Sequence, residues 1–175
     1  MVPLSEKYVD QLVSWRSLPE AQEHQPITIQ NREHFLQFVR ERHKTDIKVL
    51  ADCDYILVIE DAESGKGVGW MTMEIFSQVH GLARIGYTII PECWNQGFAT
   101  SALATIVEWL FGETFVERIE ADCSIHNPAS RRVLEKCGFR NVGIKRKFLV
   151  IQGERVDHYY YELLKDDWFN GSRFT

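Results

Sequence analysis

The sequence predicts a mixed α/β fold whose sheet is mostly antiparallel, with one parallel pair of strands near its centre and helices at its sides. Short stretches rich in β-branched residues alternate with longer stretches that are apolar at helical spacing. Short turns join the strands of the first half, which is typical of antiparallel neighbours. In the second half a long helix separates two strands, and such a crossover implies that these strands run parallel.

The first part of the chain favours two helices. Ser5 can cap a helix that ends near Pro19. The polar stretch 20–30 is expected to be a loop. A second helix is expected over 33–43, where apolar residues recur at helical spacing.

Three strands are expected next, over about 55–60, 68–76 and 82–90, because each stretch is rich in β-branched residues. The turn between the first two contains Gly65 and Gly67. Closely spaced glycines also occur in dinucleotide-binding loops, but those loops enter a helix. Here a strand follows, so the glycines indicate a hairpin.

The second half is expected to alternate between helices and strands. The expected elements are a helix over about 98–111, a strand over 118–123, a helix that opens at Asn127 and ends at Gly138, and two strands over 145–151 and 156–164. No internal repeat or linker interrupts this pattern, so we expect one domain over residues 1–175.

The composition is that of an ordinary globular protein. Apolar residues make up 45% of the chain and charged residues 26%, and the formal net charge of -5 does not favour a nucleic-acid partner. No apolar run reaches the ~20 residues that a membrane span requires, and the N-terminus lacks the layout of a signal peptide. We therefore expect a cytoplasmic protein that binds neither membranes nor nucleic acid.

The four cysteines show no metal-binding spacing. They are Cys53, Cys93, Cys123 and Cys137. None belongs to a C-x-x-C pair, and no histidine stands at zinc-finger distance from them. In a reducing compartment we expect them to be buried, apolar side chains, and we expect no metal site.

The junction between the strand over 82–90 and the helix over 98–111 carries the first functional signal. Residues 95–100 leave the strand and enter the helix. The first N–H groups of a helix have no partners within it and carry partial positive charge. Gly97 and Ala99 keep this backbone accessible. The stretch therefore suits a phosphate or pyrophosphate, although a plain tight turn would also explain it.

Four motifs follow one another around this junction. They are Ile85-Gly86-Tyr87, Trp94-Asn95-Gln96-Gly97-Phe98-Ala99-Thr100, Asn127-Pro128-Ala129-Ser130 and Glu135-Lys136-Cys137-Gly138-Phe139. In this order they resemble the GNAT superfamily of acyl-CoA-dependent N-acetyltransferases, and within it the RimJ/RimL type. The resemblance covers residues 1–165 and is strongest over 82–140. The resemblance implies the GNAT fold, in which the central parallel strands splay apart.

One position departs from the family's pyrophosphate loop, which is often written Q/R-x-x-G-x-G/A. Trp94 stands where the Gln or Arg would be. RimJ/RimL-type members often carry an aromatic residue there, and we expect this one to pack against the protein. Because the position offers no side-chain cation, phosphate binding would depend mainly on backbone N–H groups.

The resemblance implies acetyl-CoA as the cosubstrate, without a metal. It places the coenzyme between the splayed strands, where the backbone around Ile89 would bond the pantetheine arm and stabilise the oxyanion. Asn127 would also bond the arm, and Arg131 could neutralise a phosphate. The implied coenzyme-binding residues are Tyr87, Thr88, Ile89, Asn95, Gln96, Gly97, Phe98, Ala99, Thr100, Asn127, Ser130 and Arg131.

Two residues are candidates for catalysis. Ser130 would lie near the sulfur and could protonate the departing thiolate, although a serine that only starts a helix is the alternative. Glu74 is a candidate general base, with His126 and the pair Asp157 and His158 as alternatives. An α-amine with a pKa near 7.7–8 is already about one-tenth unprotonated at pH 7, so modest help would suffice.

The acceptor is expected to be a primary amine, either the α-amine of a protein N-terminus or a polyamine or other small molecule. The helices over 5–17 and 33–43 are expected to form much of its binding wall. Two other interpretations stay open: a covalent acyltransferase that uses Cys93 or Cys123 with a histidine, and an acyl-CoA-binding module without catalysis. The sequence also leaves open whether two copies form a homodimer.

Overall fold

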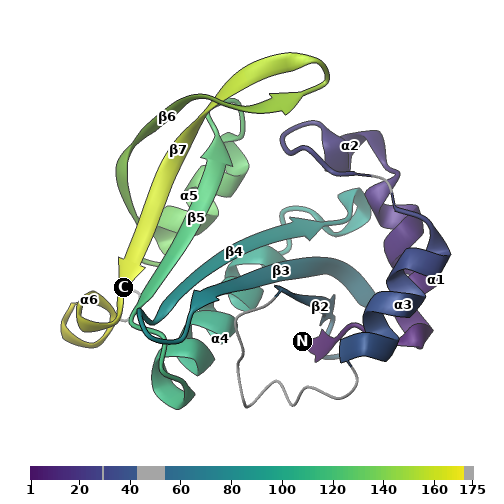
Figure 1. Cartoon of the computed structure of the whole chain (residues 1–175), viewed down its shortest axis with the longest axis horizontal. Helices are drawn as coiled ribbons and strands as arrows, with labels where there is room; N and C mark the ends of the chain where they lie inside the picture. The colour runs from purple at the N-terminus through teal and green to yellow at the C-terminus, as the bar shows by residue number, and fades with distance from the viewer. Residues whose placement is uncertain (29, 43–53, 172–175) are drawn as a thin grey trace.

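A seven-stranded sheet forms the centre of the protein, in the order β1-β2-β3-β4-β5-β7-β6 (Figure 1). The computed structural model describes residues 1–28, 30–42 and 54–171. Every neighbouring pair of strands is antiparallel except β4 and β5, which are parallel. The strands are β1 (Val2–Pro3), β2 (Asp54–Glu60), β3 (Gly67–Ser77), β4 (Leu82–Ile89), β5 (Arg118–Ser124), β6 (Arg140–Ile151) and β7 (Glu154–Leu164). The predicted mixed sheet with one parallel pair is confirmed.

The parallel pair separates soon after it forms. β4 and β5 pair only from Leu82 with Arg118 to Arg84 with Glu120, yet β4 continues to Ile89 and β5 to Ser124. Figure 1 shows the two arrows diverging beyond this short contact. The expected splay is therefore present, and it leaves a V-shaped opening in the sheet, which we call the split.

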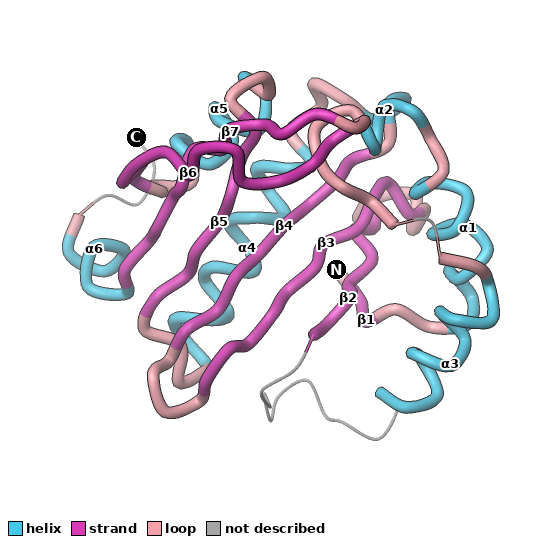
Figure 2. The backbone as a smooth tube through the Cα atoms, turned by 45° about the horizontal axis from the view of Figure 1, so that its top comes forward, coloured by secondary structure: helices cyan, strands magenta, loops and turns pink. Residues whose placement is uncertain are grey.

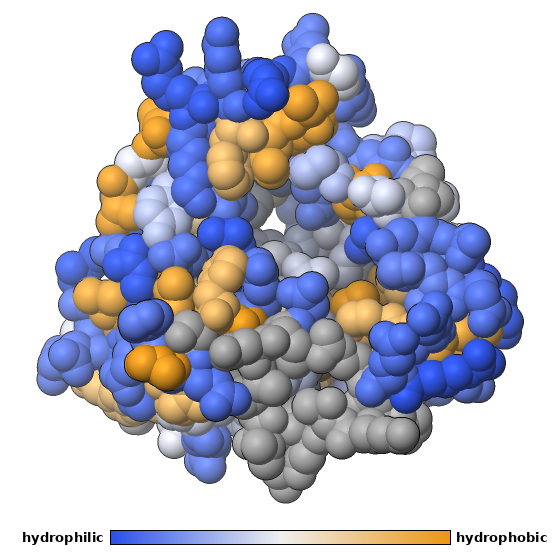
Figure 3. Space-filling model, in the orientation of Figure 1, coloured by the Kyte–Doolittle hydropathy of each residue, from blue (hydrophilic) through white to orange (hydrophobic). Residues whose placement is uncertain are grey.

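Helices cover the two faces of the sheet unequally (Figure 2). The main helices are α1 (Glu6–Arg16), α3 (Arg32–Arg42), α4 (Phe98–Glu113) and α5 (Pro128–Lys136). The core under α4 takes alternate residues of the central strands, such as Ala83, Ile85 and Ile89 of β4. A second core joins α1 and α3 to Val58 and Trp70 on the opposite face. The centre of that opposite face is hollowed in the space-filling view (Figure 3), and we call it the open face.

Some elements differ from those that the sequence predicts. The stretch 20–30 is only partly a loop, because Pro19 opens the short helix α2 (Pro19–Gln22) after α1 has ended at Arg16. Proline suits the first turn of a helix, where its missing N–H is not needed. Ser5 precedes α1 without a side-chain capping bond. The short elements β1 and α6 (Lys165–Asn170) are too brief for a periodic signal.

The last hairpin is longer than predicted. β6 begins at Arg140 instead of 145, because this end pairs with Glu162 of β7. Irregularities in the register after Asn141 and after Lys145 interrupt the alternation that identifies a strand. At the tip, Gln152 (φ 50) and Gly153 (φ 86) are both left-handed, as a two-residue hairpin turn requires.

A few predictions fall on other parts of the chain. His43, at the end of the second predicted helix, and Cys53 lie outside the described residues. Among the described cysteines, Cys123 and Cys137 are buried as predicted, while Cys93 is half-buried. Of the described helices, none combines the length and apolarity that a membrane span needs.

Candidate active site

The loop between β4 and α4 presents backbone N–H groups at the helix start. Asn95 (φ 59) and Gly97 (φ 85) both have left-handed backbones, and Gly97 is the N-cap of α4 without a side-chain capping bond. A Cβ on Gly97 would meet no atom within 4 Å, so the space in front of the backbone is open. The N–H groups of Phe98, Ala99 and Thr100 in the first helical turn are therefore available to an anion.

Side chains of the same loop hold it in shape. The indole Nε1 of Trp94 donates to the carbonyl oxygen of Ile89 at 2.7 Å. Gln96 Nε2 donates to the carbonyl oxygen of Glu92 at 3.0 Å. Trp94 is 46% exposed, so it holds the loop through this hydrogen bond and not by burial of its ring. Any contact of Gln96 to a phosphate would use its backbone N–H.

The backbone of β4 alternates between its two neighbours. Ile90 donates its N–H to Val68 at 3.0 Å, which orients the backbone groups of Thr88 towards β3 and those of Tyr87 and Ile89 towards the split. Tyr87 and Ile89 are therefore the residues that can bond a pantetheine arm through their backbone. The backbone of Thr88 pairs with Trp70, so the predicted contact of Thr88 with the coenzyme would have to use its side chain.

The side chain of Thr88 lies on the open face instead. Its Oγ1 accepts a hydrogen bond from Gln25 Nε2 at 2.6 Å. Gln25 belongs to the segment that follows α2. The end of β4 is thus connected to the part of the chain that borders the open face.

The start of α5 faces β4 across the split. Asn127 is the N-cap, and its Oδ1 accepts the N–H of Ser130 at 2.9 Å. The hydroxyl of Tyr87 lies 3.1 Å from Ser130 Oγ and donates to the Ser130 carbonyl at 3.2 Å. Burial raises the pKa of Tyr87, so its phenol stays protonated at neutral pH. The structure thereby brings Tyr87 and Ser130 together from two elements that are separate in the sequence.

Two predicted coenzyme contacts at α5 already have partners in the protein. Because Asn127 Oδ1 caps the helix, a bond to the pantetheine arm would use the amide nitrogen of that side chain. Arg131 forms an ion pair with Glu135 at 3.1 Å, and Glu135 raises the pKa of Arg131. Its charge is therefore already partly compensated.

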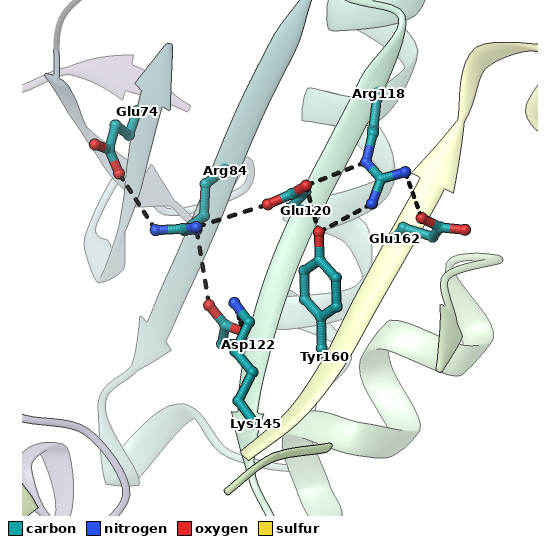
Figure 4. Close-up of polar contacts among 8 residues, drawn as sticks. All are labelled: Glu74, Arg84, Arg118, Glu120, Asp122, Lys145, Tyr160 and Glu162. Atoms are coloured by element: carbon teal, nitrogen blue, oxygen red, sulfur yellow. Dashed lines mark hydrogen bonds and ion pairs between the residues drawn. The ribbon is translucent and has the colours of Figure 1, made fainter. Parts of the chain in front are cut away.

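Eight side chains form a polar network on the open face where the split begins (Figure 4). Arg84 lies at its centre, 3.8 Å from Glu74 of β3 and 3.6 and 3.7 Å from Glu120 and Asp122 of β5. We call this network the sheet-face charge cluster. Its other members are Arg118, which pairs with Glu120 and Glu162, Lys145, which pairs with Asp122, and Tyr160, which donates to Glu120.

Comparison with known proteins identifies the family. A family model described as an acetyltransferase (GNAT) domain matches residues 1–140. The chain belongs to the GNAT acetyltransferases. N-acetyltransferase YoaA of Bacillus subtilis (strain 168) is 34% identical over 107 residues, which are 61% of this chain and 60% of YoaA. The ribosomal protein uS5-alanine N-acetyltransferase of Escherichia coli is 29% identical over 87 residues, which are 50% of this chain and 45% of that protein. The chain thus spans about half of the curated GNAT relatives that it matches.

Solved structures share the whole fold. Spermidine N-acetyltransferase from Vibrio cholerae, in complex with CoA and spermine, has a TM-score of 0.83 at 16% identity and covers 96% of both chains. Ribosomal-protein-S5-alanine acetyltransferase from Vibrio fischeri has a TM-score of 0.81 at 22% identity, over 95% of this chain and 92% of that chain. At these identities the likeness shows the GNAT fold and leaves the acceptor open.

Glu74, the predicted base of this GNAT chain, lies at the closed end of the split. It pairs in register with Arg84, and Thr88 lies four residues further along β4. At about 3.3 Å per residue this separation is roughly 13 Å, well beyond the reach of a direct proton transfer. Burial and the nearby Asp54 raise the pKa of Glu74. Its role as a base stays a prediction, and it would have to act through water.

The sequence interpretation missed the residues that surround Glu74. Arg84 and Asp122 have no motif of their own, but a signal was present in 118–124, where charged residues occupy alternate positions of a strand. Alternation places these charges on one face. Lys145 of β6 also contacts this cluster, and its Nζ lies 2.6 Å from Asp122 Oδ1. No sequence pattern predicts this contact.

The alternative nucleophiles and bases lie in less suitable surroundings. Burial raises the pKa of Cys123, and its Sγ lies 3.4 Å from the carbonyl oxygens of Ser124 and Asn127, which suits a protonated thiol. His126 is exposed. His158 is buried, with Nδ1 3.1 Å from the carbonyl of Val156. Among the described residues, no group of three potential metal ligands comes together.

Proposed function

We propose that this chain transfers an acetyl group from acetyl-CoA to a primary amine. The observation that carries the proposal is the split between β4 and β5, together with the uncapped start of α4 at one end of it. The split supplies unpaired backbone groups for an extended, amide-rich arm, and the helix start supplies N–H groups for a pyrophosphate. Acetyl-CoA combines these two parts with a reactive thioester.

The reaction is direct attack of the amine on the thioester. The amine nitrogen bonds to the carbonyl carbon, the C–S bond breaks, the thiolate gains a proton and the amine loses one. Ile89 would donate its backbone N–H to the oxyanion of the tetrahedral intermediate. Ser130 would donate its proton to the thiolate, while Tyr87 holds the Ser130 hydroxyl in place. The amine would enter from the open face.

An α-amine is the acceptor type that needs the least help from the protein. At a pKa near 7.7–8, about one-tenth of it is already unprotonated at pH 7, and Glu74 lies too far away for direct contact. The RimJ/RimL resemblance, supported by the uS5-alanine N-acetyltransferase relative, also favours a peptide α-amine. The GNAT neighbour solved with spermine keeps a polyamine as the alternative.

A thiol-release assay tests the proposal. The purified protein is incubated with acetyl-CoA and, in parallel, with α-amino peptides, polyamines and other small amines, and free CoA is measured. We expect release that depends on a primary amine and an acetylated product of matching mass. Binding of acetyl-CoA without turnover of any amine would favour a non-catalytic binding module instead.

A further inference from the structure

An uncharged groove borders the open face next to the end of β4. The segment after α2 and the tip of the β6–β7 hairpin border this open groove, which has a volume of about 280 Å³. Gln25, which lines it, bonds to Thr88 at 2.6 Å, so the groove lies beside the split. The lining residues are Gln22, Gln25, Pro26, Ile27, Thr28, Val150, Ile151 and Gln152. None of these side chains carries a formal charge.

A cation lies behind this groove. Arg16, at the end of α1, donates from Nη2 to the carbonyl oxygen of Thr28 at 3.2 Å, and Thr28 lines the groove. The guanidinium lies 5.5 Å from the ring centroid of Phe35 and 6.0 Å from that of Trp70. Because Trp70 pairs with Thr88 of β4, the guanidinium lies on the β3 side of the split.

Arg16 has no carboxylate partner within the described part of the chain. No carboxylate there lies at ion-pair distance from its guanidinium, in contrast to Arg84 and Arg118. Its Nε is buried without a hydrogen-bond partner. Burial lowers the pKa of Arg16. Arg16 is only partly buried, but a partly desolvated cation without a counter-ion still favours an anion at this position.

We infer that Arg16 binds an anionic group of the acceptor, so that among primary amines, peptide α-amines included, the preferred acceptors also carry a carboxylate. A guanidinium matches a carboxylate with two parallel N–H donors. The amine would face the split while the carboxylate reaches the groove beside Thr28. A polyamine would instead bring a second ammonium towards Arg16, and like charges repel. The inference rests on the proposed acetyl transfer and specifies its acceptor.

Matched acceptors test the inference. 4-Aminobutyrate carries a carboxylate where 4-aminobutanamide carries a neutral amide, and both have the same primary amine. Acids and amides with shorter and longer chains give further matched pairs. We expect kcat/KM from thiol release to favour the best acid over its amide by roughly ten- to a hundredfold, the worth of a hydrogen-bonded charge pair. Arg16→Gln should bring this ratio close to one, and Arg16→Lys should keep part of it.

A matched control separates Arg16 from surface charge in general. Arg40 of α3 has a 61% exposed side chain and pairs with Glu33, so Arg40→Gln removes the same charge and should keep the acid-to-amide ratio. The acid-to-amide ratio of the wild-type protein is measured without any variant. The inference can therefore be tested even if Arg16→Gln fails to fold. Equal rates for every acid and its amide, or a ratio that survives Arg16→Gln, would overturn the inference.

A binding measurement distinguishes this inference from the proposed function. Trp70 lies beside Arg16, so its fluorescence can follow 4-aminobutyrate binding to the CoA-bound protein. Saturable binding that is lost in Arg16→Gln, with no turnover, would support the anion site and refute acetyl transfer. If amines are acetylated without any preference for acids, acetyl transfer is supported and the anion site at Arg16 is refuted. If the protein shows no binding and no turnover, both proposals are refuted.

Discussion

The pair formed by Tyr87 and Ser130 illustrates what single residues contribute to this site. Ser130 stands out from the sequence because it lies three residues after Asn127 in a motif that resembles the family. Tyr87 carries no such signal for a catalytic role, since a tyrosine in a strand usually packs. Only the fold brings its hydroxyl to 3.1 Å from Ser130 Oγ, and this contact requires the two strands to separate.

Substitutions at the start of α5 should separate chemistry from binding. Ser130→Ala removes a donor that acts mainly in the transition state, so kcat should fall roughly 10- to 1,000-fold with little change in acetyl-CoA affinity. Tyr87→Phe should lower kcat less, because it removes only the group that orients Ser130. Asn127→Ala should weaken coenzyme binding and also cost about 1 kcal/mol of stability, since Asn127 caps the helix. Steady-state kinetics and calorimetry check these outcomes, and an unchanged kcat in Ser130→Ala would reduce Ser130 to a helix-start residue.

Substitution of Gly97 should weaken coenzyme binding in addition to straining the backbone. Gly97→Val forces a β-branched residue into a left-handed backbone, which costs about 1–2 kcal/mol of stability. It also crowds the helix start and should weaken acetyl-CoA binding by about 1.5–3 kcal/mol, the worth of charge-assisted hydrogen bonds. Gly65, with φ +67 and open space around it, is the control: Gly65→Val should lower the melting temperature similarly and leave calorimetric affinity unchanged. Equal coenzyme affinity in both variants would contradict the phosphate assignment.

At the scale of elements, the sequence predicts what is periodic and misses what depends on distant partners. The main helices and central strands follow from hydrophobic spacing, and the crossover helix gives the parallel pair. The first five residues of β6 are not predicted as a strand, because their strand conformation comes from pairing with β7 and their register is irregular. The candidate site shows the same contrast. The loop at Gly97 is visible as a motif, whereas the sheet-face charge cluster joins five strands, β3 to β7, and has no single local pattern.

The stability contributed by Glu74 should depend on pH. Burial and Asp54 raise its pKa, so the folded state disfavours the ionised form. The stability contributed by protonated Glu74 is present below the unfolded pKa and is lost as pH rises through the folded pKa. Glu74→Gln should therefore retain or slightly raise the melting temperature at pH 7 relative to wild type, and lose this advantage near pH 3.5. The effect should be small because the side chain is 44% exposed. A clear drop in stability at pH 7 would show that the ion pair with Arg84 dominates, and a loss of activity alone would support a catalytic role.

For the molecule as a whole, the coenzyme should act as a stabilising ligand. A ligand that binds only the folded state adds about 2.7 kcal/mol of stability at a hundredfold excess over its Kd. CoA and acetyl-CoA should therefore both raise the melting temperature of this chain, and NADH should not, because the glycines before Val68 form a hairpin turn. A response to NADH with none to CoA would refute the coenzyme assignment.

The short contact between β4 and β5 means that the sheet is incomplete without a ligand. The backbone amides of Tyr87 and Ile89 lie inside the fold, yet they point to a gap where a neighbouring strand would stand. In the ligand-free protein these two amides should exchange with deuterium far faster than the amides of Thr88 and Ile90, which face β3. Coenzyme binding would then slow their exchange as strand pairing does. The pantetheine arm would thus serve as a short, removable strand, and the last step of building this sheet would be repeated at every turnover.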